Sequence, residues 1–545
     1  MKAIHIPRFL CFRIFILSAC FIFTGIFFSC SSSTEEEGGT TNSKSVQVYF
    51  GGLQINDADS SDVSTKSAQV SVTKVVDMGN GFDAVCTLSP QQSSCAKSII
   101  NMTSGVYYRV IIYNSTGTAL VGYKDYVAGA SSDSQTPFTL DAGTTYKYVA
   151  YSYNTQTAIG DAAPTISTTL TPNLGLDLLY TSGSFTAAYP TTSITLTFKH
   201  LVAGIDVELD SNGMFGPMGT TTTSITGQLR KGTLTLSSGS FVTASSTTDD
   251  SNVSSASSST SSRWSSVATT DTTRTVSFYS APGNTITLNV TFNLIQIKQD
   301  YSTTTSGYWE FSNKSVSFGS IALTAAKKYI CHVYLRASYL QIGSASDTKW
   351  ARGNLYLASD GKYKFRHHQS GFYSDTSSSS LEYWNFNSTV GAASTADYGS
   401  GDPCAQVLPS GTWRLPTQSE LNTLSTESFY DATTQTTPHD AIATAWNAYN
   451  YTSSASSDTW GTLRIALLHF GYRGSGSTTI LQGPTSLSST NGYSGNGYYW
   501  SSTSNPANNA QAYALQLTST GRNTRTVAVV SMSKSLGLDV RCVRN

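Results

Sequence analysis

Cys30 is the residue whose position indicates its chemistry most directly. It follows a basic leader and an apolar run of 15 residues from Ile14 to Phe28, and the residues after it are polar. This layout is typical of a secretory signal with a small residue, here Ser29, at the cleavage site. Removal of residues 1–29 would place Cys30 at the first mature position, where its thiol can accept a lipid. We therefore predict a signal peptide over residues 1–29 and lipidation of Cys30.

Two alternatives compete with this interpretation. A retained transmembrane helix needs roughly 20 apolar residues, whereas this run is shorter and acidic residues follow it. Cleavage before Cys20 has the commoner bacterial sequence context, but it would leave the apolar residues 21–28 on the mature protein. Cys30 is the preferred site, and residues 31–37 resemble the acidic export signal of surface lipoproteins in Gram-negative gut and oral anaerobes. We expect an outer-membrane lipoprotein at the cell surface.

Five further cysteines follow Cys30, an odd number that allows at most two internal disulfides and leaves one thiol free. Cys86 and Cys95 could close a small loop, and the sequence leaves this bond and two free thiols equally open. Cys331 lies in an expected strand and is predicted to be an inert buried thiol. The other two cysteines belong to the last segment of the chain.

Other residues that could catalyse a reaction or bind a metal do not form a recognisable set. His367-His368 and His439-Asp440 have no partner cysteine or carboxylate at ligand spacing. No Ser-His-Asp order, pair of carboxylates or phosphate-binding loop stands out, so we expect no catalytic site, no metal, no cofactor and no enzymatic activity. Lys plus Arg equals Asp plus Glu at 33 each, and this balance gives no support for nucleic-acid binding.

The elements that carry these residues are expected to be strands. Charged residues make up only 12% of the chain, and Ser, Thr, Asn, Gly and 31 Tyr supply its polarity. Such a composition suits an exported β-protein. Apolar and polar residues alternate in short runs separated by turn formers, most strictly over residues 286–294. Helix-length amphipathic patterns are absent from the first 340 residues, so this part is predicted to form β-sandwiches.

Three stretches of this part resemble the fimbrillins, the subunits of type V pili. They are Thr145–Ser152 (TYKYVAYS), Asp177–Tyr180 (DLLY) and Leu196–Leu201 (LTFKHL), in that order. The resemblance covers roughly Val46 to Leu335, and the family implies two transthyretin-like β-sandwiches in tandem.

The last segment has a different set of sequence motifs. Gly411–Leu421 (GTWRLPTQSEL), Tyr498–Thr503 (YYWSST) and Val540–Arg544 (VRCVR) resemble the C-type-lectin-like module. Thr417 and Glu420 have capping-box spacing after a proline, which predicts a helix that carries Leu421 and Leu424 inward.

Two consequences follow from the resemblance to the C-type-lectin-like module. In that family the pair matching Cys404 and Cys542 is linked, and a bond across 138 residues would stabilise the fold by about 4–5 kcal/mol. The tripeptides with which calcium-dependent lectins hold calcium and sugar are absent, so calcium-dependent glycan binding is not supported.

The predicted fold is therefore mainly β, with two tandem transthyretin-like β-sandwiches followed by an α+β C-type-lectin-like domain. The predicted segments are a signal peptide at 1–29, a tether at 30–45, a first sandwich at 46–187, a second sandwich at 188–340 and a C-terminal domain at 341–545.

Aromatic residues of the last segment are the candidates for ligand contact. Trp413 and Trp500 are expected in the core, whereas residues 371–400 and 474–497 are expected to form contact surface. The candidate ligand contacts are Trp384, Tyr472, Tyr493 and Tyr498.

Together the two resemblances imply an accessory or tip subunit of type V fimbriae. The C-terminal domain would be an adhesive head for a glycan or protein of a host or bacterial surface. The family implies that a protease cuts after a basic residue, that the first strand leaves, and that a strand of the next subunit takes its place. Lys44 and Lys66 are the candidate cut sites, because no arginine lies between Cys30 and Arg109. The lipid would hold the precursor at the membrane until this cut. The alternative is a surface lipoprotein that keeps its lipid, binds glycan or protein ligands and never polymerises.

Overall fold

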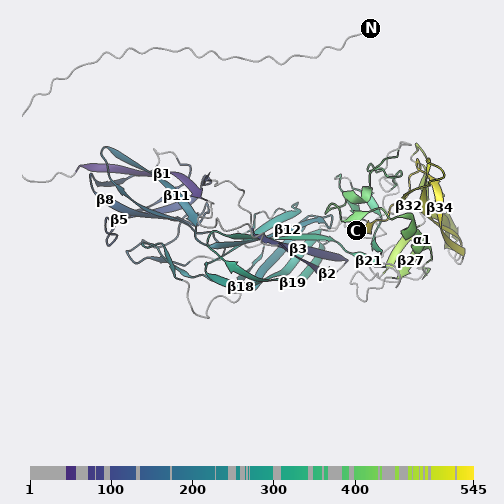
Figure 1. Ribbon diagram of the computed structural model, residues 1–545, viewed down its shortest axis with the longest axis horizontal. Coiled ribbons are helices and arrows are strands. Elements are labelled where there is room, and N and C mark those ends of the chain that lie inside the picture. Colours follow the sequence, from purple (N-terminus) through teal and green to yellow (C-terminus); the bar gives the residue numbers. More distant parts are fainter. Residues whose placement is uncertain are drawn as a thin grey trace, which may run out of the picture. The chain divides into compact units, whose positions relative to one another are not determined.

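The described part of the chain is mainly β-strand (Figure 1), as the sequence predicts. The computed structural model describes residues 44–545 except 57–70, 80, 91–98, 131–134, 172–174, 227–228, 243–252, 258–263, 266–267, 269, 299–307, 342–347, 359–360, 366–382, 392–397, 427–429, 432–447, 453–463, 469–470, 478, 483–484, 489–491 and 522–523. Cys30, Lys66 and Cys95 lie outside the described residues, as do the histidine pairs. Ser45–Asn545 forms one compact unit.

The first sandwich has two layers that share strand β11. In one layer β1 lies between β11 and the pair β4 and β7, and in the other the order is β10-β8-β5-β6. β11 pairs with β1 along most of its length and with β10 at its last two residues. The strands are β1 (Ser45–Asn56), β4 (Ile99–Asn101), β5 (Tyr107–Asn114), β6 (Leu120–Val127), β7 (Phe138–Asp141), β8 (Thr145–Ser152), β10 (Leu179–Thr186) and β11 (Thr191–His200).

Strand β5 is buried on both faces, because different elements cover each side. Its Val110 and Ile112 face the core between the two layers. Its Ile111 and Tyr113 pack against Leu170 and other residues of a small three-stranded sheet. That sheet has the order β15-β14-β9. Its strands are β9 (Thr169–Leu170), β14 (Thr233–Thr235) and β15 (Ser240–Val242).

The second sandwich consists of a five-stranded and a four-stranded sheet. The orders are β17-β12-β20-β3-β2 and β16-β13-β18-β19, and their apolar faces belong to one core. The five-stranded sheet has β2 (Val72–Gly79), β3 (Phe82–Pro90), β12 (Ala203–Gly213), β17 (Thr273–Ser280) and β20 (Lys328–Ala337). The four-stranded sheet has β13 (Met218–Thr226), β16 (Val253–Ser257), β18 (Asn284–Lys298) and β19 (Tyr308–Leu323).

The two sandwiches do not divide at residue 187, the boundary that the sequence suggested, because each contains strands from both sides of it. The hairpin β2–β3 lies before that boundary, yet β3 pairs with β20 of the second sandwich. β11 lies after the boundary, yet it pairs with β1. Alternation shows which face of a strand is buried, but it does not show which strand lies alongside, and this explains the difference.

The C-terminal module, residues 339–545, contains several small sheets around a short helix. One sheet has the order β21-β22-β35-β25, and the largest has the order β31-β32-β33-β34. The first of these has β21 (Tyr339–Gln341), β22 (Lys349–Ala351), β25 (Trp413–Arg414) and β35 (Val543–Arg544), and the second has β31 (Thr485–Ser488), β32 (Gly492–Ser504), β33 (Gln511–Gly521) and β34 (Thr524–Ser533). The other elements are β23 (Leu355–Leu357), β24 (Tyr363–Phe365), the 3-10 helix η4 (Pro403–Gln406), α1 (Gln418–Thr426), β26 (Tyr430–Asp431), β27 (Ala448–Thr452), β28 (Arg464–Leu468), β29 (Tyr472–Arg473) and β30 (Ile480–Leu481).

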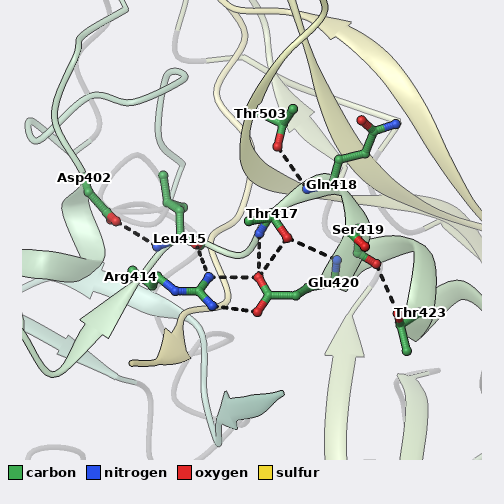
Figure 2. Close-up of polar contacts among 9 residues, drawn as sticks. All are labelled: Asp402, Arg414, Leu415, Thr417, Gln418, Ser419, Glu420, Thr423 and Thr503. Atoms are coloured by element: carbon green, nitrogen blue, oxygen red, sulfur yellow. Dashed lines mark hydrogen bonds and ion pairs between the residues drawn. The ribbon is translucent and has the colours of Figure 1, made fainter. Parts of the chain in front are cut away.

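Helix α1 begins where the capping box predicts (Figure 2). The backbone N–H of Glu420 donates to the Thr417 hydroxyl at 3.2 Å, and the backbone N–H of Thr417 donates to the Glu420 carboxylate at 2.7 Å. Arg414 forms a bidentate ion pair with the same carboxylate, in which its Nη2 and Nη1 donate to Oε1 and Oε2 of Glu420 at 2.6 and 2.8 Å. Leu421 and Leu424 are buried, so the prediction for this helix is confirmed.

Candidate functional sites in the first strand and the C-terminal module

Strand β1 fills a slot in the first sandwich. It runs parallel to β11 on one side and antiparallel to β7 and β4 on the other. Val46 and Val48 are fully buried, and Phe50 is 1% exposed. Burial of each such side chain is worth about 1.5–3 kcal/mol, so β1 contributes much of the apolar core of this sandwich.

Phe50 of β1 is packed against three aromatic side chains. Its ring makes edge-to-face contacts with Phe138, Tyr148 and Phe185, at centroid distances of 5.6 to 5.9 Å. The hydroxyl of Tyr108 donates to the Phe50 carbonyl at 3.2 Å. The position of Phe50 in this slot is therefore lined by three aromatic rings.

A bulge follows Phe50 and is made of glycines. The pairing of β1 with β11 shifts register between Gly51 and Gln54. Gly52 has φ +59°, and a Cβ there would lie 3.0 Å from the hydroxyl oxygen of Thr195. A side chain at this position would be strained, which explains the glycine.

The two candidate cut sites lie on opposite sides of β1. Lys44 is exposed and directly precedes the strand. Lys66 belongs to the connection between β1 and β2, outside the described residues. A cut after Lys44 would leave β1 on the mature chain, whereas a cut after Lys66 would separate it from the rest.

The last strand of the sequence is held inside the C-terminal module. β35 pairs with β22 on one side and with β25 on the other. Cys404 and Cys542, the pair that the resemblance to the lectin-like module implies, form a disulfide with a Cα–Cα distance of 5.7 Å. The segment before α1 is therefore covalently tied to the segment that enters β35.

A buried ionic cluster joins β35 to the second sandwich. Asp83 on β3 pairs with Arg336 at 2.8 Å and with Arg544 at 3.0 Å. Arg544 also donates to the carbonyl of Ala337 at 2.6 Å. Burial lowers the pKa of the Arg544 guanidinium, and the carboxylate of Asp83 opposes this shift.

Two of the aromatic residues predicted to contact a ligand are not available to one. Trp384 is 0% exposed, and its indole N–H donates to the Leu355 carbonyl at 3.3 Å. Tyr498 is 3% exposed and belongs to the same core. The sequence predicts that both residues contact a ligand, but their rings fill the core, so both expectations need correction. Tyr472 is half-buried, and the side chain of Tyr493 lies outside the described part.

Polar residues that the sequence did not single out surround the edge of Tyr498. Its hydroxyl donates to Gln482 at 2.5 Å and accepts from Asn496 at 3.1 Å and Gln516 at 3.0 Å. We call Tyr472, Gln482, Asn496, Tyr498 and Gln516 the amide cluster. Gln482 and Asn496 fall in the stretch 474–497 that the sequence predicts to form contact surface, but no sequence signal distinguishes Gln516.

The remaining described cysteines are buried thiols. Cys86 and Cys331 are both free and fully buried, so Cys86 forms no disulfide and Cys331 is as predicted. Burial raises the pKa of Cys86 to about 12 and also raises that of Cys331. A thiol with a raised pKa is a poor nucleophile, so these two cysteines do not suggest a reactive site.

The described residues contain neither a candidate metal site nor a candidate membrane-spanning helix. There, no group of three or more His, Cys, Asp or Glu side chains could hold a metal ion. None of the described helices has the length and apolar character that crossing a membrane requires.

A known protein family resembles most of the region that forms the two sandwiches. Residues 96–350 match the fimbrillin-like family model. The match supports a fimbrial or adhesive role for the protein. It ends at residue 350, so it does not bear on the likeness of the C-terminal module to C-type-lectin-like domains.

Solved structures give more distant similarities. A candidate cell adhesion protein from Bacteroides fragilis is 12% identical with a TM-score of 0.30, covering 59% of this chain and 96% of that chain. The fimbrial anchor protein Mfa2 from Porphyromonas gingivalis is 14% identical with a TM-score of 0.22, covering 46% of this chain and 77% of that chain. No curated protein matches the chain.

Proposed function

We propose that this protein is an accessory subunit of a type V fimbria, which exchanges β1 for a strand of another subunit and presents its C-terminal module as an adhesive head. The observation that carries the proposal is the position of β1. It lies between partner strands on both sides, buries one face completely, and precedes a connection that contains a lysine. A single cut in that connection would separate the strand from the rest of the fold.

Lys66 is the cut site that this proposal requires. Cleavage there releases residues 30–66 together with the lipid on Cys30 and the whole of β1. Cleavage after Lys44 removes the lipid but leaves the slot filled, so it cannot prepare the subunit for a donor strand. The hairpin β2–β3 begins at Val72 and pairs with β20 in the second sandwich, which would hold the new N-terminus in place.

Loss of β1 would expose a groove with strong affinity for an extended peptide. Within the described residues, β4 and β7 pair with no strand other than β1, so their backbone groups and those along one edge of β11 would lose their partners. The apolar slots of Val46, Val48 and Phe50 would also be open to water. An incoming strand restores both kinds of contact at once, which is the basis of strand addition.

The groove also constrains the donor segment. A strand that follows the path of β1 must place apolar side chains at three alternate positions, because successive residues point to opposite faces. The third of these positions favours an aromatic ring, because Phe138, Tyr148 and Phe185 surround it. Next to it, the bulge requires a glycine, as at Gly52.

A terminal position in the fibre is supported by the way β35 is held. A shaft subunit must give a strand to its neighbour as well as accept one. Here residues 543–544 pair on both sides, Cys542 is disulfide-bonded, and Arg544 is paired with Asp83. Release of this segment would break the ionic cluster and the sheet, so residues 543–544 are poorly suited to act as a donor strand.

Fractionation of cells and sheared fibres tests the assignment. We expect the protein in the fibre fraction, with antibodies against residues 341–545 labelling fibre ends. Labelling along the whole shaft would contradict the tip position. Recovery of all the protein in the membrane fraction would instead support the non-polymerising lipoprotein.

A further inference from the structure

The amide cluster is a fixed set of polar groups on one face of the sheet that contains β32 and β33. Tyr498 and Gln516 are directly opposite each other on these strands. The side chain of Asn496 donates to Gln482 at 2.6 Å, and the backbone N–H of Asn496 donates to the Gln482 carbonyl at 3.0 Å. Every one of the three amides is thus oriented by a hydrogen bond to the buried phenol or to another member of the cluster.

Each amide keeps one polar atom that the cluster does not use. Gln482 accepts two hydrogen bonds through Oε1, which leaves its NH₂ group as a donor. Asn496 and Gln516 donate through their NH₂ groups, which leaves Asn496 Oδ1 and Gln516 Oε1 as acceptors. These three atoms have no hydrogen-bond partner among the described residues. Gln482 is exposed, and the other two amides are half-buried, so the free atoms lie at the surface.

The surroundings favour a sugar over a peptide strand. Tyr472 is half-buried, with its ring edge-to-face against that of Tyr498 at 5.3 Å, so part of an aromatic surface borders the amides. The backbone of β32 is already bonded on both sides here, to β33 and to Gly471 and Gln482. Strand addition is therefore blocked at this place, and a ligand has to be recognised through side chains.

We propose that the amide cluster binds a neutral glycan, with the amides of Gln482, Asn496 and Gln516 contacting its hydroxyl groups and Tyr472 bordering an apolar sugar face. A hydroxyl both donates and accepts, which matches two free acceptors together with the unused N–H groups of Gln482 and Gln516. The cluster contains no Lys, Arg, His, Asp or Glu side chain that could pair with a charged group, which favours a neutral ligand. This inference rests on the proposed role of the C-terminal module as an adhesive head.

Binding of the full-length protein to an array of neutral and acidic glycans tests the inference. We expect retention on neutral glycans, undiminished by EDTA because the cluster contains no carboxylate. Gln482→Ala and Gln516→Ala should each weaken binding about tenfold, since each removes hydrogen bonds to the sugar. Gln511→Ala should leave binding unchanged, because residue 511 lies on the opposite face of β33 by strand alternation.

Tyr498→Phe separates positioning from contact. This variant keeps the ring in the core but removes the hydroxyl that orients the amides, so binding should weaken while the melting temperature changes by only a few degrees. Tyr513→Phe on the opposite face of β33 is the matched control and should bind normally. If Tyr498→Phe bound the glycan as tightly as the wild type does, the positioning role of the Tyr498 hydroxyl would be overturned.

Fibre incorporation of the same variants distinguishes this inference from the proposed function. If no neutral glycan is retained, or if Gln482→Ala and Gln516→Ala bind normally, the glycan site is wrong. The subunit would still be fimbrial if these variants enter fibres as the wild type does. Glycan retention by a protein that never enters fibres would keep the glycan site and reject the fimbrial role.

Discussion

Arg544 and Asp83 are 461 residues apart in the sequence and form a buried ion pair at 3.0 Å. The guanidinium of Arg544 also lies over the rings of Tyr339 and Trp413, at 4.9 and 5.1 Å from their centroids. A strand that follows the proposed cut site is thereby joined to the last strand of the C-terminal module. The second sandwich and this module are consequently expected to unfold together.

Removal of the Asp83 carboxylate should be strongly destabilising. Asp83→Asn leaves Arg336 and Arg544 without their buried counter-charge, and we expect a loss of about 3–5 kcal/mol in the free energy of unfolding. Denaturant unfolding of the variant and the wild type measures this loss in the free energy of unfolding. Asp77→Asn, at an exposed position of β2, is the control and should change stability by less than about 0.5 kcal/mol. Equal stability of the two variants would show that the cluster does not couple the two parts.

Truncation of Phe50 should destabilise the uncut precursor. Phe50→Ala opens a cavity among three aromatic rings, and such changes cost about 3–5 kcal/mol. Tyr49→Ala is the neighbouring control on the opposite face of β1, and its effect should be much smaller. Unfolding of the first sandwich, followed by tyrosine fluorescence or proteolysis, reports both. Similar losses in the two variants would contradict the packing described for β1.

Reduction of the Cys404–Cys542 bond should weaken the C-terminal module. We expect dithiothreitol to lower the stability of the wild type by about 2–5 kcal/mol, the usual effect of losing a native disulfide. The double variant Cys404→Ser/Cys542→Ser should start lower and should not respond to dithiothreitol. A response of the double variant would mean that the reductant acts elsewhere.

The start of α1 should make stability depend on pH in acid. Burial acts to raise the pKa of Glu420, but hydrogen bonds from Arg414 and Thr417 outweigh it and hold the pKa below the ordinary 4.5. A carboxylate with a lowered folded-state pKa stabilises the fold above pH 4.5, and this contribution is lost as the pH falls through the folded-state pKa. Glu420→Gln should therefore flatten the decline of melting temperature below about pH 4.5.

Asp402 provides the opposite case in the same region. Burial raises its pKa above the ordinary 3.8 despite hydrogen bonds from Leu415, Cys404 and Ala405. Its contribution is present below pH 3.8 and is lost as the pH rises through the folded-state pKa. Asp402→Asn should thus steepen the acid decline that Glu420→Gln flattens. Changes of the same sign in both variants would contradict these assignments.

Local features of the fold were predictable from the sequence, whereas long-range ones were not. Thr417 and Glu420 act within one turn, so their spacing located the helix start. Strand alternation indicated buried faces correctly in stretches such as 286–294. The pairing of β3 with β20 depends on residues more than 200 positions apart, and no local pattern records it.

The candidate sites show the same limit. Residue type and sequence position favour Trp384 and Tyr498 as ligand contacts, but burial is decided by the tertiary structure and not by residue type. The amides of Gln482 and Gln516 become a cluster only when β30 and β33 lie near Tyr498. The resemblance to known families supplied the pairing of Cys404 with Cys542, which spacing alone could not.

The N-terminus of the mature protein in sheared fibres is the most direct test of the strand-exchange account. Mass spectrometry should find a chain that begins at Ser67, without lipid and without residues 45–56. Lys66→Ala should abolish this product and keep the protein in the membrane fraction, whereas Lys44→Ala should assemble normally. A fibre-borne chain that begins at Cys30 or Ser45, with β1 still attached, would contradict the account.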